Sequence, residues 1–553
     1  MEMERSCTFD ELNFDEACVI LKSNINLPNL WLYTLSSDCI KCPYSRAAMI
    51  ESEIISMKVK SARSQYWRII ETDKHEEYIP AWDENGLYCQ LSPNIGEFGI
   101  YELTVDYNNS YSFVANKQPV NSHLPLVIIL GLIALFLCVL SILKIIFNCV
   151  KRCRSKDVQI ETVESSSSKP RLRSLDTVRG MSILLMIFVN NGAGGYVFLE
   201  HATWNGLFVG DLVFPCFLWI MGVCIPLSIS SQLTRGTSRF SICCAIVKRS
   251  FYLFFIGISL NTLGGKNQLE SIRIFGVLQR FSVCYLVTAM IYLLLVSPCT
   301  HLGSKVVYEI LILMPQWIIA FFILLAHCVI IFLLPVPDCP KGYLGPGGRH
   351  DAGKYWNCVG GAAGYVDKVL LGVNHIYQFP TANSVYGSGP FDPEGVLGCL
   401  TSIFQVFLGI QAGQILCHYE DWKNRIARWL VWALIFGVIG LSLHFTEIIP
   451  VNKNLWSVSF VMVTTSFSLG LLSACYFLVD VIGVWEGGPF RIPGMNALVM
   501  YIGHQVFYEM FPFHWRIGKM NTHSWLMAES LWCIVLWTCI AYTLHWKKLY
   551  VTL

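Results

Sequence analysis

The amino-acid sequence predicts a polytopic α-helical membrane protein of about eleven transmembrane helices, with a small β-rich domain at its N-terminus. Of its 553 residues, 54% are hydrophobic and only 14% are charged, whereas average soluble domains carry about 25% charged residues. The charge is also uneven, because residues 1–122 hold 28 of the 78 acidic and basic residues. Eleven long apolar stretches follow. These observations exclude a single soluble enzyme, a disordered chain and a basic nucleic-acid-binding protein.

Residues 1–122 have the pattern of a small domain built from half-buried strands. Polar and apolar residues alternate in 100–107 and in 111–115, and Gly, Asn and Pro bound these stretches. A period of two is typical of strands with one buried face. Acidic residues outnumber basic ones in this region, so the net charge of +2 for the whole chain sums opposed parts.

Five cysteines and one glycosylation pattern indicate that this domain lies in an oxidising, non-cytosolic compartment. Asn108 begins the pattern Asn-Asn-Ser and is the expected glycosylation site. Cys39 and Cys42 are separated by two residues, a spacing that suits a local disulfide, a redox pair or a metal site. No second pair or histidine partner lies nearby in the sequence, which favours the disulfide, and no bound metal is expected.

The remaining chain divides into apolar segments and polar connections. A first segment, 123–150, is long enough to cross a bilayer core of ~30 Å. It precedes a basic, serine-rich linker at 151–177, a ten-helix domain at 178–546 with a long loop at 336–395, and a short tail at 547–553. The ten further apolar stretches lie near 178–198, 209–231, 240–262, 272–296, 308–335, 396–416, 427–445, 455–480, 494–512 and 525–546.

Basic residues set the predicted orientation of these segments. Lys and Arg gather in the linker and in the loops on its side of the membrane, and cytosolic loops are enriched in these residues. The linker and the C-terminus are therefore predicted to be cytosolic, and the β-rich domain and the loop 336–395 to be luminal. The first residues lack the apolar stretch of a signal peptide, so we expect either a start upstream or a processed chain.

Polar side chains inside the spans point to a functional cavity. A charge at mid-helix costs about 2.5–3.5 kcal/mol on insertion, so such groups usually face a cavity or a partner. Asn190 opens an Asn-Asn-Gly sequence at the luminal end of the second span, where glycines break the helix and let backbone line a cavity. His201 follows eleven residues later and is the best general-base candidate, with a structural or solvated histidine as the alternative.

Further polar residues are expected in the same interior. Asp211 can orient the candidate base, or it can pair with Arg273 or Arg280 in the bundle. Arg280 lies within an apolar run, and its alternative role is a structural ion pair. Asn496 and His504 are eight residues apart and so share roughly one helical face. For His504 a satisfied histidine of the bundle is the alternative.

A series of motifs runs in a fixed order through the membrane domain. The motifs are RLRSLDTVRG (171–180), HATWNG (201–206), DLVFP (211–215), GVLQR (276–280), GYLGPGG (342–348), GGAAGY (360–365), DPEG (392–395), PVNKNLW (450–456), PGMN (493–496) and GH (503–504). This series closely resembles the heparan-α-glucosaminide N-acetyltransferase family of transmembrane acyltransferases. The resemblance is dense from about Arg171 to the C-terminus, and it is thinner in the preceding part of the chain.

The resemblance implies transfer of acetyl from cytosolic acetyl-CoA to the terminal glucosamine amine of heparan sulfate inside the lysosome. Acetyl-CoA is then a co-substrate, and no permanently bound cofactor is expected. In that family the histidine matching His201 is catalytic and the asparagine matching Asn190 lies beside it. Further pocket positions by analogy are Asp176, Arg179, Asp211, Arg280, Asn496 and His504. The resemblance also implies a Cys89–Cys358 disulfide, a homodimer and a place in the lysosomal membrane.

This reaction suits a spanning architecture, because acetyl-CoA cannot cross lipid and the polysaccharide is enclosed in the lumen. His201 can accept a proton from the glucosamine amine while Asn190 donates to the developing oxyanion. Alternatively His201 itself takes the acetyl group and passes it on. The competing functions are an acyltransferase with another acceptor and a transporter. No inverted repeat relates the two halves of the sequence, which counts against the transporter.

Overall fold

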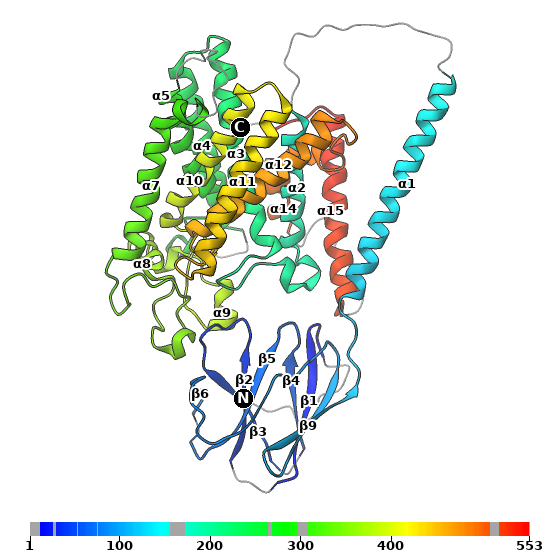
Figure 1. Cartoon of the computed structure of the whole chain (residues 1–553), viewed down its shortest axis with the longest axis vertical. Helices are drawn as coiled ribbons and strands as arrows, with labels where there is room; N and C mark the ends of the chain where they lie inside the picture. The colour runs from blue at the N-terminus through cyan, green and yellow to red at the C-terminus, as the bar shows by residue number, and fades with distance from the viewer. Residues whose placement is uncertain are drawn as a thin grey trace.

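The computed structural model of the chain describes residues 12–551, apart from 26–28, 52–53, 75, 155–171, 264–267, 297–307 and 509–518. A β-rich domain lies at one end of a bundle of long helices (Figure 1). The last helix begins beside this domain and ends at the opposite end of the bundle. Most of the predicted linker at 151–177 falls outside the described residues.

The described residues of the N-terminal domain form nine strands, which confirms the predicted β-rich region and both strands predicted from alternation. The strands are β1 (Glu16–Ser23), β2 (Leu30–Ser36), β3 (Tyr44–Met49), β4 (Ile55–Lys60), β5 (Gln65–Glu71), β6 (Tyr78–Ile79), β7 (Leu87–Leu91), β8 (Ile100–Asp106) and β9 (Ser110–Lys117). One sheet has the order β4-β1-β8-β9, and the other has the order β6-β3-β2-β5-β7. The β1–β8 pair is parallel, and the other described pairs are antiparallel.

The two sheets enclose one hydrophobic core. Trp67 of β5 and Leu103 of β8 are fully buried in it, one from each sheet. Alternate residues of β8 are buried, as expected when one face of a strand packs inward. The domain is therefore a β-sandwich. Asn108 lies exposed with a positive φ of 63° between β8 and β9, so the predicted glycosylation site is accessible.

Helices joined by turns and loops make up the rest of the described chain. The longer ones are α1 (Leu124–Arg154), α2 (Arg173–Asn190), α3 (Val213–Thr234), α4 (Arg239–Asn261), α5 (Val277–Leu295), α7 (Met314–Leu333), α10 (Val396–His418), α11 (Trp422–Phe445), α12 (Val458–Cys475) and α15 (His523–Trp546). Shorter ones are α6 (Tyr308–Ile312), α8 (Gly361–Leu371), α9 (Thr381–Tyr386), α13 (Arg491–Met495) and α14 (Ala497–Val506). Single 3-10 turns are η3 (Ala193–Gly195), η4 (Val197–Leu199), η5 (Val209–Leu212), η6 (Leu269–Ser271), η7 (His350–Gly353) and η8 (Val373–His375). A π-helical segment, η9 (Tyr476–Val481), continues α12.

Eight helices in the described part are long and apolar enough to cross a membrane, which confirms a polytopic membrane protein but not the predicted count of eleven. They match the predicted spans near 209–231, 240–262, 272–296, 308–335, 396–416, 427–445, 455–480 and 525–546. The other three predicted spans correspond to α1, α2 and α14. Of these, α2 carries Arg173, Asp176 and Arg179, and α14 has only 10 residues.

The helices α3 and α10 form the centre of the bundle and lie directly against each other. Gly222 and Gly409 allow this approach, since a Cβ at either would lie 2.1 Å from a backbone oxygen of the other helix. Gly413 repeats the contact one turn further, where a Cβ would lie 2.3 Å from the oxygen of Val223. Small residues at helix crossings are the usual means of close packing in membranes.

The β-rich domain contacts the helical bundle through the long loop and through the start of α15. The Tyr386 hydroxyl donates to the backbone oxygen of Asp38 at 2.8 Å and accepts from the N–H of Ile40 at 3.2 Å. On α15, Nε2 of His523 lies 2.9 Å from Oδ1 of Asp15. These bonds join the domain to the same end of the bundle that carries the segment 191–208 (Figure 1).

Candidate active site

A histidine–carboxylate pair lies in the segment between α2 and α3. Nδ1 of His201 is 3.0 Å from Oδ1 of Asp211 in η5. The other carboxylate oxygen, Oδ2, accepts the N–H groups of Ala202 and Phe208 at 3.0 Å each. Because a carboxylate can only accept, this hydrogen bond forms with the proton on Nδ1, and the lone pair is then on Nε2. The His201 side chain is 32% exposed, whereas that of Asp211 is fully buried. Of the two residues, the histidine is therefore the one that solvent or a substrate can reach.

A glycine next to the carboxylate brings the two residues together. The N–H of Gly210 donates to the oxygen of Glu200 at 3.1 Å. A Cβ at position 210 would lie 2.4 Å from that oxygen and 3.0 Å from Nδ1 of His201. The missing side chain therefore lets the segment with the histidine lie directly against η5.

The two arginines considered as alternative partners of Asp211 are engaged elsewhere. Arg273 binds both oxygens of Asp392 at 2.9 and 2.6 Å and Oε2 of Glu394 at 2.6 Å. Burial would raise the pKa of Glu394, but Arg273 holds it below its ordinary value. Arg280 is fully buried and donates to the backbone oxygen of Gly395 at 2.9 Å. Asp211 therefore pairs with His201 and not with Arg273 or Arg280, and its orienting role stays a prediction.

Lys453 also lies at this site, although the sequence reasoning did not single it out. Its Nζ is 3.0 Å from Nδ1 of His201 and 3.7 Å from Oδ1 of Asp211. The segment between α11 and α12 is placed here by Asn452, whose Nδ2 donates to Oδ1 of Asn205 at 3.0 Å. The only signal in the sequence was the PVNKNLW motif itself, since a lysine before a span is an ordinary feature of a membrane protein.

The surroundings of His201 lower its pKa below the ordinary value. Desolvation is the largest cause, and the positive charge of Lys453 acts in the same direction. The hydrogen bond to Asp211 and the charge of that carboxylate raise the pKa, but they do not outweigh the first two effects. The imidazole is therefore suited to accept a proton under mildly acidic conditions.

Asn190, at the end of α2, forms a polar pair with a histidine of α14. Its Nδ2 is 2.9 Å from Nε2 of His504, whose Nδ1 is 3.0 Å from the backbone oxygen of Met500. Nδ1 of this buried histidine therefore donates and Nε2 accepts the amide proton. The structure has no hydrogen bond between Asn190 and His201, both of which it describes. Their juxtaposition in catalysis stays a prediction.

The remaining predicted pocket residues lie where α2 meets α13. Arg179 lies 3.2 Å from Asp176, and its Nη1 is 3.4 Å from the backbone oxygen of Gly494. A Cβ at Gly494 would lie 1.9 Å from the oxygen of Asp176, so the backbones touch here. Asn496 bonds to the backbone of residues 549–551 through Oδ1 and Nδ2. In this structure Asn496 thus anchors the C-terminal segment, and its contact with a substrate stays a prediction.

The disulfides agree with one prediction and correct another. Cys39 and Cys42 form the expected local disulfide. Cys358 pairs with Cys339 within the long loop, so the predicted pairing with Cys89 is wrong. Cys89 is a free thiol on β7 that packs against the core of the sandwich, and burial raises its pKa to about 11.

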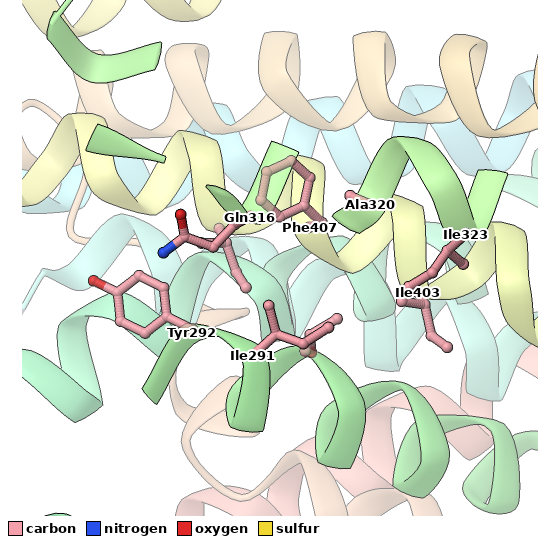
Figure 2. A pocket seen from close by; sticks show the side chains of 9 residues that line it. Ile291, Tyr292, Gln316, Ala320, Ile323, Ile403 and Phe407 are labelled. Carbon is pink, nitrogen blue, oxygen red and sulfur yellow. The ribbon is translucent and has the colours of Figure 1, made fainter. Parts of the chain in front are cut away.

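A small apolar pocket lies elsewhere in the bundle, between α5, α7 and α10. Tyr292, Gln316 and Phe407 line it together with six further residues (Figure 2). The Gln316 amide has no hydrogen-bond partner among the described residues. The pocket shares no residue with the His201 site.

The comparisons with known proteins identify two relatives that cover nearly the whole chain. A curated Homo sapiens protein named heparan-alpha-glucosaminide N-acetyltransferase is 38% identical over 592 aligned positions, which include 98% of this chain and 88% of that protein. The Mus musculus protein of the same name is 37% identical over 593 positions, 98% of this chain and 89% of that protein. No family model matches the chain.

Proposed function

Because the chain belongs to the heparan-α-glucosaminide N-acetyltransferase family, we propose that it moves acetyl from cytosolic acetyl-CoA to the terminal non-reducing α-D-glucosamine amine of heparan sulfate in the lysosomal lumen. The observation that carries this proposal is the His201 site. Oδ1 of Asp211 lies 3.0 Å from Nδ1 of His201, and with the proton on Nδ1 the base is Nε2 of a side chain that is 32% exposed. Amide formation from a glucosamine needs such a base, since the amine is protonated near neutral pH and below.

The proton balance assigns the base a specific task. The glucosamine ammonium first loses one proton to Nε2 of His201, which makes the amine nucleophilic. The amine then forms the N–C bond to the acetyl carbon as the C–S bond of the thioester breaks. The second proton of the reacting nitrogen passes to the departing sulfur, so the products are the N-acetyl amide and free CoA thiol. The proton on His201 is finally released to the lumen.

The fixed Asp211 also supports the base after it has taken up the proton. Its Oδ2 accepts two backbone N–H groups, so the carboxylate cannot turn away from the imidazolium. A covalent route through an N-acetyl form of His201 uses the same free Nε2. An isolable acetyl-histidine after incubation with acetyl-CoA alone would favour that route, and its absence would favour direct transfer.

The arrangement of the molecule supports transfer across a bilayer. The β-rich domain, the long loop and the His201 segment share one end of the bundle, and α15 ends at the other (Figure 1). We assign the first end to the lysosomal lumen and the second to the cytosol. Arg179 contacts Gly494, two residues before Asn496, which bonds to the segment that follows α15. We assign Arg179 with Asp176 to the entry of acetyl-CoA. A homodimer is part of the same proposal.

The function is tested with purified protein, acetyl-CoA carrying a labelled acetyl group, and a heparan oligosaccharide that ends in glucosamine. We expect label on the terminal amine, and none on a matched oligosaccharide whose terminal glucosamine is already N-acetylated. Label on a different amine or glycan only would show that the acceptor is wrong. Movement of unreacted acetyl-CoA or glucosamine without a product would indicate a transporter.

A further inference from the structure

A lysine side chain accompanies the histidine–carboxylate pair at the proposed site. Lys453 approaches Nδ1 of His201 to 3.0 Å and Oδ1 of Asp211 to 3.7 Å, and its own side chain is only 14% exposed. The three residues come from two parts of the chain that lie about 250 positions apart. A buried lysine needs an anionic partner, and the nearest one is the carboxylate that orients the proposed base.

The hydrogen-bond chemistry leaves Lys453 an electrostatic role. An ammonium group has donors only, and Nδ1 of His201 already donates to Asp211. The lysine lies 3.0 Å from that nitrogen, but it can donate to it only in the other tautomer, in which the ring proton is on Nε2. With the proton on Nδ1, Lys453 acts through its charge alone. Its charge opposes the charge of the carboxylate from a distance of 3.7 Å.

This charge matters because a histidine–carboxylate pair alone is poorly suited to an acidic compartment. A nearby carboxylate stabilises the imidazolium, which would fill Nε2 with a proton before the substrate arrives. Desolvation and Lys453 act against this, and the pKa of His201 lies below its ordinary value. The other charged group that faces His201 is Glu394, which is itself neutralised by Arg273. Lys453 is thus the nearest cation to the base.

We propose that Lys453 is a positioning residue of the acetyl-transfer site: its ammonium group offsets the charge of Asp211 and so keeps Nε2 of His201 free of a proton at acidic pH. This inference rests on the proposed function, in which His201 is the base. It explains how His201 can be oriented by the carboxylate of Asp211 and still take a proton from an amine in an acidic lumen.

The test compares the pH dependence of kcat/KM for the full-length wild type, Lys453→Met and Lys453→Arg between about pH 4.5 and 7.5. Removing one adjacent positive charge shifts a neighbouring pKa by about one unit or more. We therefore expect the acid limb of the Met variant to move to higher pH. Its ratio of kcat/KM at pH 5 to that at pH 7.5 should fall about tenfold against the wild-type ratio. The Arg variant should keep the wild-type ratio, because it keeps the charge.

A matched control is Lys354→Met, which removes a lysine from the long loop at a site where Nζ lies over the ring of Tyr355. It should keep the wild-type ratio. An equal loss of kcat/KM at all pH values in Lys453→Met would indicate a merely structural lysine and overturn the inference. An unchanged acid limb would overturn it as well. No acetylated product from the wild type at any pH would instead refute the proposed function.

A second measurement does not depend on turnover. Diethyl pyrocarbonate modifies neutral imidazole, so the rate at which the His201 peptide is modified reports its free base. At about pH 5 we expect this rate to fall about tenfold in Lys453→Met and to stay at the wild-type value in Lys453→Arg. Equal rates in all three proteins would contradict the proposed role of the lysine. If Lys453→Met does not fold, Lys453→Gln replaces it in both measurements.

Discussion

Replacing the orienting carboxylate by an amide, Asp211→Asn, should reverse the proton position on His201. Oδ2 of Asp211 accepts the N–H groups of Ala202 and Phe208 at 3.0 Å each. The amide oxygen of Asn can keep both bonds, and this places Nδ2 opposite Nδ1 of His201. Because an amide nitrogen only donates, Nδ1 must then accept, and the ring proton moves to Nε2. The base is blocked although the fold is kept.

The structure also sets the size of this effect. Regaining the active tautomer requires the Asn amide to flip, which leaves the two backbone N–H groups without an acceptor in a fully buried position. A buried donor without a partner costs about 1–3 kcal/mol, so the flip costs about 2–6 kcal/mol. Since 1.36 kcal/mol corresponds to a tenfold change in rate, we expect kcat to fall between about 30-fold and about 10⁴-fold.

The assay is turnover of labelled acetyl-CoA with a glucosamine-terminated acceptor, measured for purified Asp211→Asn and for the wild type. Thermal unfolding should show that the variant is folded, and Asp338→Asn on the exposed surface of the long loop should retain wild-type turnover. A well-folded Asp211→Asn protein with kcat within threefold of the wild type would refute the reasoning, because the carboxylate would then not set the tautomer.

Two further predictions concern the fold. Gly409→Ala should destabilise the protein by about 1–3 kcal/mol or more, because the new Cβ would lie 2.1 Å from the backbone oxygen of Trp219. The control Gly470→Ala, with nothing within 4 Å of the new atom, should unfold at the wild-type temperature. Equal melting temperatures of the two variants would contradict the packing of α3 on α10. Burial raises the pKa of the Asp367 carboxyl to about 7. The folded state therefore keeps a proton that the unfolded state loses above about pH 4. The free energy of unfolding should fall by up to about 4 kcal/mol as the pH rises from 4 to 7. Asp367→Asn should reduce this loss in thermal unfolding at a series of pH values, and an identical pH dependence in the variant would argue against the raised pKa.

Much of the fold follows from local sequence patterns. Alternation predicted the strands β8 and β9, and runs of apolar residues predicted the eight helices of the described part that are long and apolar enough to cross a membrane. The count of eleven is not confirmed, because two of the predicted spans, α2 and α14, are too polar or too short to qualify. The helix α2 carries three charged residues in its first two turns, and α14 ends after 10 residues.

The candidate site was predicted only in part, because its contacts link distant segments. His201 and Asp211 stand ten residues apart, so the sequence could suggest their pairing but not choose it over Arg273 or Arg280. Lys453 was missed, since its position depends on the hydrogen bond between Asn452 and Asn205, 247 residues away.

The disulfide pairing of Cys358 shows a different limit. The resemblance to a family suggested Cys89 as the partner, whereas the structure pairs Cys358 with Cys339, 19 residues away in the same loop. A motif conveys which residues are shared, but not how close they come in space. The position of Cys89 against the core of the β-sandwich is a property of the folded sheet and is not visible in the spacing of cysteines.

The most direct test of the central claim reconstitutes the protein in sealed liposomes that enclose a glucosamine-terminated heparan oligosaccharide. Acetyl-CoA carrying a labelled acetyl group is added outside only. The account predicts labelled, N-acetylated oligosaccharide inside liposomes that hold the wild type with its β-rich domain facing inward, and none with His201→Ala in the same orientation. Enclosed product with the His201→Ala protein, or no enclosed product with a folded wild type, would contradict it.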